Sequence, residues 1–153
     1  MSVKHLKTPL SLAQATTIVD AALAAGREAG LNPLTVVVLD IGGHPIALKR
    51  EDGSGLVRAN LALGKAWGAL GMGWSSRELG AKNTERPVFL NTLAAASQGR
   101  TVPVAGGVLV CDDQGMVIGA VGISGDTSDR DERCAIAGIN AAGLTPDPAE
   151  PTN

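Results

Sequence analysis

Hydrophobic residues recur every three to four positions from residue 11 to residue 29, a period that predicts an amphipathic helix. Ser11 and Gln14 stand at its start with the spacing of a capping box, in which two side chains bond free backbone amides. Gly30 and Pro33 follow, so we expect the helix to end by residue 29. The apolar face is made of Leu12, Ala15, Val19, Leu23 and Gly26.

Two later stretches join apolar runs through turn residues, which is the pattern of β-hairpins. The first comprises Leu34–Leu39, the turn Asp40–Gly43 and Pro45–Arg50; the second comprises Val108–Cys111, the turn Asp112–Gly115 and Met116–Ser124. Alternation on the returning strand of the first hairpin predicts Ile46, Leu48 and Arg50 on one face and Ala47 and Lys49 on the other. Shared turn chemistry is enough to make the hairpins alike, and we draw no duplication from the likeness.

Four further segments have helical spacing and start or stop signals. The second helix opens at Ser54 and Gly55 and stops at Gly71–Gly73, the third starts with Ser75 and Glu78 as a capping box, the fourth covers Val88–Ala96 after Pro87, and the last covers Asp129–Ala142. We expect a loop or short edge strand over 98–107. The proline-rich tail is expected to be mobile or to lie along the surface.

The order of elements is helix, hairpin, helices, hairpin, helix. Antiparallel hairpins in one sheet with helices on its faces give an α+β layer architecture, whereas parallel strands would need a helical crossover between single strands. The chain has 153 residues, of which 44% are hydrophobic, and this suits one core. We therefore expect a single domain over 1–145 and a flexible tail over 146–153.

Charge and composition exclude several partners. The net charge of −2 comes from interspersed acids and bases, which provide no basic surface for nucleic acid. The sequence has neither a run of about 18 apolar residues nor the features of a secretory signal, so we expect no membrane partner and a cytoplasmic location. Cys111 and Cys134 lack a CxxC spacing, and the two histidines, His5 and His44, lack a metal-binding spacing, so no metal site is expected.

The stretch from Ser124 to Glu132 carries four acids between a strand and the last helix. A glycine-rich turn before a helix can bind phosphate, but these carboxylates would repel an anion. One interpretation is helix capping, with Ser128 as N-cap and acids in the first turn. The other is a site for a ligand or for acid/base catalysis by Asp131 and Glu132, since the glycines of this region could leave room for a ligand as well as for a helix. The acids are Asp126, Asp129, Asp131 and Glu132, and the glycines are Gly119, Gly122 and Gly125.

Three basic residues are further candidates. Arg50 ends an apolar strand face, where it could hold a carboxylate ligand by two hydrogen bonds or pair with Asp52 or Asp131. Lys65 lies beside the apolar side of the second helix; if desolvated, its pKa would fall and it could act as a base or nucleophile. His44 follows the Gly-Gly turn, where it is either a solvated side chain or an axial haem ligand.

Several stretches together resemble the GlcG/HbpS family, which also occurs as the C-terminal domain of PduO proteins. They are VVVLDIGGHPIALKREDG, then Lys65-Ala66, then GGVLVCDDQGMVIGAVGISGDTSDRDERCAIAG, and the match runs from about residue 11 to residue 143. Relatives often have proline where Leu109 stands, and the first helix here lacks a histidine. The family's polar positions carry over as Asp40, Gly42, Gly43, Arg50, Asp52, Gly53, Lys65, Gly106, Gly107, Ser124, Gly125, Asp131 and Glu132.

The resemblance implies a mostly antiparallel sheet of about five strands flanked by helices, in a profilin-like arrangement of layers, and a homo-oligomer, either a dimer or larger. It also implies binding of a small molecule, either haem or another tetrapyrrole with His44 as ligand and Arg50 or Lys65 on a propionate, or a small organic acid. An alternative is a cofactor-independent enzyme for an oxo- or hydroxy-acid in a catabolic operon. In that hypothesis Arg50 binds the carboxylate, and Asp131 or Glu132 moves protons.

Overall fold

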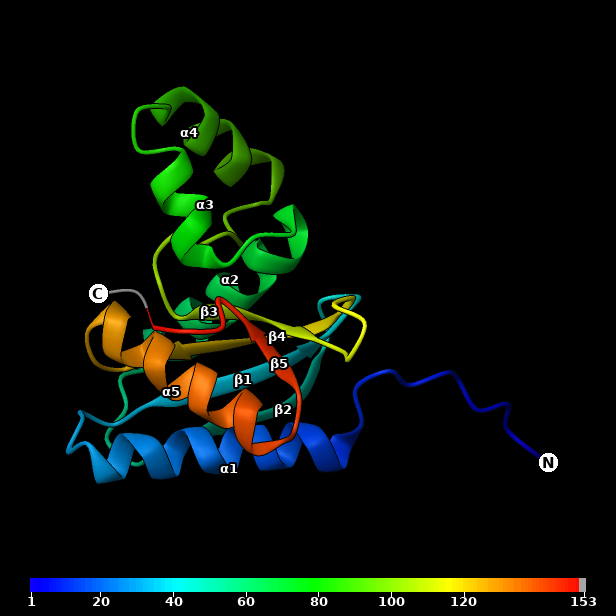
Figure 1. Cartoon of the computed structure of the whole chain (residues 1–153). Coiled ribbons are helices and arrows are strands. Elements are labelled where there is room, and N and C mark those ends of the chain that lie inside the picture. The colour runs from blue at the N-terminus through cyan, green and yellow to red at the C-terminus, as the bar shows by residue number, and fades with distance from the viewer. Residues whose placement is uncertain (152–153) are drawn as a thin grey trace.

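A computed structural model describes residues 1–151 of the chain and shows five helices around a five-stranded sheet (Figure 1). The helices are α1 (Leu12–Glu28), α2 (Val57–Met72), α3 (Ser76–Lys82), α4 (Pro87–Ala96) and α5 (Ser128–Ala141). The strands are β1 (Thr35–Asp40), β2 (Pro45–Arg50), β3 (Gly107–Cys111), β4 (Val117–Ser124) and β5 (Thr145–Asp147). Every pairing is antiparallel, in the order β2-β1-β4-β3-β5. The predicted α+β layer fold is confirmed.

The sheet separates two hydrophobic layers. On one face, α1 and α5 pack side by side over the central strands and bury residues such as Val36, Val38 and Val121 (Figure 1). On the other face, α2 buries Val37 and Leu39 together with its own alanines. Alternate residues of β1 therefore enter different layers, as the side-chain period of a strand requires.

Most predicted element boundaries agree with the structure. The Ser11 hydroxyl accepts from the Gln14 amide at 3.1 Å, and the Gln14 side chain accepts from the Ser11 amide at 2.9 Å, which confirms the capping box of α1. Ser54, however, does not open α2, because its hydroxyl pairs with that of Thr35 and the helix begins at Val57.

Two features of the sheet differ from the prediction. The register between β1 and β2 shifts at Val38/Leu39, so Ile46 is an extra residue on β2. Ile46 therefore packs with Ala47 against the α1–α5 layer instead of sharing a face with Leu48. In addition, the first two residues of the expected tail, Pro146 and Asp147, pair with β3 together with Thr145 as strand β5. Residues 152–153 of that tail lie outside the described part of the chain.

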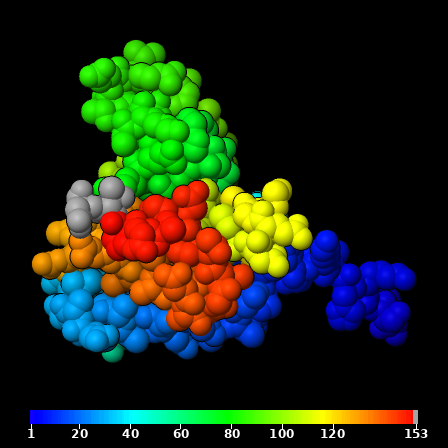
Figure 2. All heavy atoms as spheres, viewed as in Figure 1, coloured from blue at the N-terminus to red at the C-terminus, as the bar shows by residue number. Residues whose placement is uncertain are grey.

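Helix α3 touches the sheet at its first residue, Ser76, and helix α4 stands away from the sheet (Figures 1 and 2). Ser75 caps α3 by accepting from the Glu78 amide at 3.2 Å. Helix α4 is rich in apolar residues, yet it contains no buried residue. Segment 98–106 then returns to the sheet as a loop, and the last residue of the segment considered in the sequence, Gly107, starts β3. In the described residues, no helix combines the length and the apolar character needed to cross a membrane.

Candidate functional site

His44 lies at the tip of the first hairpin, beside a hollow of about 360 Å³ between the N-terminal arm and the sheet. The imidazole is 80% exposed, and its Nδ1 lies 3.4 Å from Oδ1 of Asp40. No hydrogen bond joins the opposite ring nitrogen, Nε2, to any described residue. Most side chains that line the hollow are apolar, and the polar ones are Lys7, Thr8, Asp40 and His44. The apolar ones are Leu6, Pro9, Leu10, Leu12, Ile41, Ile46 and Ile118. His44 thus presents a free nitrogen beside an apolar surface.

Asp40 shapes the turn that carries His44. Its Oδ1 accepts from the amides of Gly42 at 2.9 Å and His44 at 3.0 Å. Asp112 makes the same two bonds in the second hairpin, to the amides of Gln114 and Met116. Turn chemistry therefore accounts for the likeness of the two hairpins, because the same Asp-centred bonds form both turns.

Lys65 and Asp131 form a buried ion pair between α2 and α5. The Lys65 ammonium donates to Oδ2 of Asp131 at 3.1 Å and to the Ile123 carbonyl at 2.9 Å. Burial lowers the pKa of Lys65 and raises the pKa of Asp131, although each charge partly offsets the effect on the other. Lys65 is therefore desolvated, which is the condition under which the sequence interpretation gave it a chemical role, and its partner is Asp131 of the last helix. The chemical role itself stays a prediction.

Glu132 is also fully buried and pairs with Arg77 of α3, a residue that the sequence interpretation did not single out. The Arg77 Nε donates to both carboxylate oxygens of Glu132 at 3.0 Å, while Nη2 contacts Asp129. The hydrogen bond to Glu132 is the main reason that the pKa of Arg77 is raised. Together with Lys65 and Asp131, these pairs tie α2, α3 and α5 together.

The acidic loop before α5 is bonded internally. Asp131 Oδ1 accepts from the Asp126 amide at 3.0 Å, and Asp126 accepts from the amides of Asn32 and Thr127. Those amide bonds hold the pKa of Asp126 below its usual value. The predicted N-cap Ser128 is wrong: Thr127 is the N-cap, without a side-chain bond, and Ser128 is the first helical residue. Because carboxylates occupy the loop amides, this loop does not offer a phosphate site.

The glycines of this region accommodate protein atoms. A side-chain carbon at Gly122 would collide with the Ala62 carbonyl of α2, and one at Gly125 would collide with the Pro33 carbonyl. Gly106 has a φ of +118° and lies against the Lys65 ammonium. Close packing of protein atoms therefore accounts for the small residues, by helix α2 at Gly122 and by the segment before β1 at Gly125. Gly107 likewise donates its amide to Ser76 Oγ at 2.7 Å.

The structure divides the sequence-predicted residues into three groups. Around the buried pair lie Lys65, Gly106, Gly107, Ser124, Gly125, Asp131 and, next to it, Glu132. Asp40 and His44 lie at the hairpin tip. Arg50 and Asp52 are exposed near the opposite end of β2, and within residues 1–151 no ion pair joins Arg50 to Asp131 or Glu132. Catalysis by Asp131 and Glu132 stays a prediction. Arg50 does not support it, because no ion pair joins Arg50 to either acid within the described residues.

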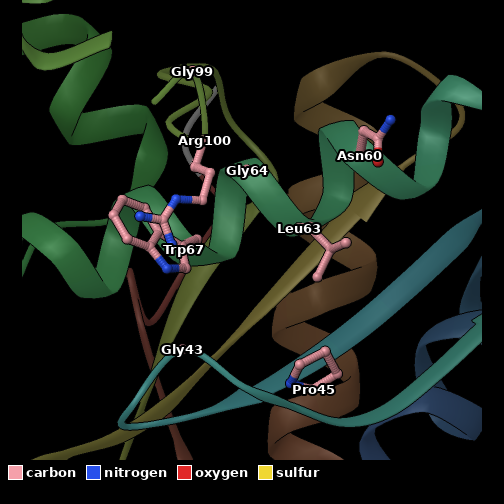
Figure 3. Close-up of a pocket in the computed structure, with 8 residues that line it drawn as sticks. All are labelled: Gly43, Pro45, Asn60, Leu63, Gly64, Trp67, Gly99 and Arg100. Atoms are coloured by element: carbon pink, nitrogen blue, oxygen red, sulfur yellow. The ribbon is translucent and has the colours of Figure 1, made fainter. Parts of the chain in front are cut away.

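A second hollow, of about 410 Å³, lies on the other side of the hairpin tip, against α2 (Figure 3). Its prominent side chains are Trp67 and Arg100, whose guanidinium lies 4.3 Å from the centre of the indole ring. Trp67 lies on α2, whereas Arg100 lies in an irregular loop and carries no recognisable motif. Only the folded chain brings the two together.

Comparison with known proteins identifies relatives across nearly the whole chain. A protein of Citrobacter freundii, an uncharacterized 15.0 kDa protein in the dhaT-dhaS intergenic region, is 30% identical over 126 residues, which are 82% of this chain and 87% of that protein. The corrinoid adenosyltransferase PduO of Salmonella typhimurium is 33% identical over 111 residues, 71% of this chain. The chain spans about a third of the length of PduO, 32%.

A solved structure shows the same fold. The crystal structure of a PduOC:heme complex aligns with a TM-score of 0.79 and 29% identity, over 88% of this chain and 96% of that one. Residues 10–140 match the family described as haem degrading protein HbpS-like. This match covers most of the chain and agrees with the resemblance found in the sequence. The protein therefore belongs to the HbpS-like family.

Proposed function

We propose that this protein binds haem or a related tetrapyrrole in the hollow beside His44. The observation that carries the proposal is the exposed imidazole, whose Nε2 has no partner in the described chain, next to a mainly apolar surface. A hollow of about 360 Å³ is within the range of small-molecule sites. The related PduOC was solved as a complex with haem, and this supports the choice of ligand.

The residues of the hollow fit this group in three respects. Asp40 lies beside Nδ1 of His44, and a carboxylate there orients an imidazole that ligates through its other nitrogen. Leucine, isoleucine and proline side chains provide an apolar surface for a macrocycle, and Lys7 provides a positive charge for a propionate. Haem would supply an iron whose oxidation state can change. Arg50 and Lys65 are not among the lining residues of this hollow.

A hemin titration of the full-length protein tests the proposal. We expect a saturable shift of the Soret band at one haem per chain, lost in His44→Ala, because the axial nitrogen is removed. His5→Ala is the matched control, since His5 is an exposed histidine outside the hollow, and it should titrate like the wild type. A band without saturation, or one unchanged in His44→Ala, would refute this assignment.

We also infer that the protein forms a homo-oligomer through α4 in the cytoplasm. Helix α4 is apolar but buries none of its residues, and Val88 is 77% exposed. An apolar helix that buries none of its residues completely is expected to be covered by a partner. Cys111 and Cys134 are free thiols, which is the state that a reducing compartment maintains.

A further inference from the structure

The hollow on the α2 side of the hairpin is separate from the His44 hollow, and the two have no lining residue in common. Three segments that are distant in the sequence form it: the turn around Gly43, the helix α2, and the loop around Arg100 (Figure 3). Its volume of about 410 Å³ suits a small molecule. Leu63 and Pro45 give it apolar walls.

Arg100 is held in place by two contacts that leave its outer nitrogens free. Its Nε donates to the Ser97 carbonyl at 3.0 Å, and its guanidinium stacks on Trp67. Within residues 1–151, neither Nη1 nor Nη2 has an acceptor. A guanidinium with a fixed plane and two free NH2 groups is suited to bind a carboxylate through parallel hydrogen bonds.

Trp67 is fixed by the hairpin tip. Gly43 has a φ of +81°, and a side-chain carbon there would lie 2.9 Å from Cδ1 and 3.0 Å from Nε1 of Trp67. Glycine therefore allows the backbone of the turn to approach the edge of the indole. The Trp67 N–H donates to no acceptor in the described residues. The hollow on the α2 side, which we call the groove from here on, thus combines a flat aromatic surface, a positioned cation and apolar walls.

We propose that this groove binds a small monocarboxylate with a flat, apolar body, of the aryl or unsaturated class. Arg100 holds the carboxylate, and the body of the ligand lies along Trp67 and Leu63. Two sources have this carboxylate chemistry, namely a free acid and a propionate of haem, and the proposal is for the free acid. It goes beyond the haem proposal, because it uses different residues on the other side of the hairpin.

Trp67 itself can report binding. Trp74→Phe leaves Trp67 as the only tryptophan, so its fluorescence and its indole N–H resonance follow the groove. We expect benzoate to cause a saturable change in both signals. Benzamide has the same shape without the charge, and it should bind at least about tenfold more weakly, because hydrogen bonds to charged groups are stronger. Equal affinity for the two compounds would overturn the proposal.

Arg100→Gln in the Trp74→Phe protein tests the role of the guanidinium. We expect the benzoate affinity of this variant to fall about tenfold or more. Arg100→Lys keeps the charge without the planar guanidinium, so its benzoate affinity should lie between those of Arg100→Gln and the parent Trp74→Phe protein. Arg86→Gln is the matched control, because Arg86 stacks on Phe89 at 4.7 Å outside the groove. If Arg86→Gln and Arg100→Gln have the same effect, Arg100 is not the carboxylate ligand.

Competition separates the two proposals. Benzoate binding that is unchanged by saturating hemin supports a site for a free acid. Benzoate that is displaced by hemin from the wild-type protein would assign the groove to haem and overturn the separate site. His44→Ala should lose the Soret shift and keep benzoate binding, so that failure of the haem proposal and failure of this one give different results.

Discussion

The Lys65–Asp131 pair has an energetic cost as well as a structural role. Both side chains are almost fully buried, at 3% and 1% exposure, so each charge loses most of its hydration. Asp131 also bonds the Asp126 amide, and Lys65 bonds the Ile123 carbonyl, so the pair fixes the start of α5 against the end of β4. Removing one partner would leave the other charge buried and unpaired.

We therefore predict that Lys65→Met destabilises the fold by about 3–5 kcal/mol at pH 7. Without the ammonium, the pKa of Asp131 in the folded state, already raised by burial, rises further. Between the ordinary pKa of an aspartate and this raised pKa, Asp131 keeps its proton in the folded state and loses it in the unfolded state. The free energy of unfolding of the variant therefore falls as pH rises through this range. Urea unfolding should show a larger loss at pH 7 than at pH 4.

Lys49→Met is the control for this prediction. Lys49 pairs with Asp20 at 2.6 Å, but both side chains are more than half exposed. Such a pair contributes about 1 kcal/mol or less, and its loss should change little with pH. Equal losses for Lys65→Met at pH 4 and pH 7 would contradict the interpretation of Asp131 as an unpaired buried acid.

Burial also determines the reactivity of the cysteines. It raises the pKa of Cys134 to about 11, and it raises the pKa of Cys111 as well. At pH 8, about one Cys134 thiol in a thousand would be the reactive thiolate. We predict that a thiol reagent modifies the native protein slowly and both cysteines rapidly in denaturant. Fast native labelling of Cys134 would show that α1 and α5 separate readily.

At the scale of single elements, the starts of α1 and α5 are built differently. Helix α1 uses a reciprocal side-chain cap between Ser11 and Gln14. Helix α5 has no side-chain bond at its N-cap, and a carboxylate of its own first turns, that of Asp131, reaches back to the preceding loop. A hydroxyl residue at the N-cap therefore does not by itself produce a side-chain cap.

This difference leads to a paired prediction. Ser11→Ala should destabilise the protein by about 1 kcal/mol, because it removes the acceptor for the Gln14 amide. Ser128→Ala should change the free energy of unfolding by less than about 0.5 kcal/mol, since its hydroxyl caps nothing. Chemical denaturation of both variants measures the two values. A cost for Ser128→Ala as large as that for Ser11→Ala would support the original capping interpretation instead.

Periodicity and turn chemistry predicted the helices and hairpins because these depend on neighbours in the sequence. Asp40, for example, acts on amides two and four residues away. The features that were missed depend on distant segments: the pairing of Thr145–Asp147 with β3, the ion pair of Arg77 with Glu132, and the stacking of Arg100 on Trp67. For the candidate sites, the sequence indicated residues such as His44 and Lys65 but not their surroundings.

At the scale of the whole molecule, α3 and α4 form a projection (Figure 2). Apolar residues of α4 such as Val88 are exposed to solvent on it. We predict that Val88→Asp shifts the protein from an oligomer toward the monomer, because a charge would be buried in the contact. Light scattering after size-exclusion chromatography measures the mass. Leu56→Asp is the matched control, since Leu56 is 83% exposed but lies outside the projection. A monomeric wild-type protein would contradict self-association through α4.

The ends of the sheet determine which kinds of aggregation the fold resists. Strand β2, at one edge, begins with Pro45, carries Lys49 and Arg50, and contains the irregularity at Ile46. Strand β5, at the other edge, has three residues with Pro146 in the middle. Prolines, charges, bulges and short lengths all hinder the addition of a foreign strand. Growth of fibrils by addition of strands is therefore disfavoured at both edges, even though the central strands β1 and β4 are apolar enough to support it.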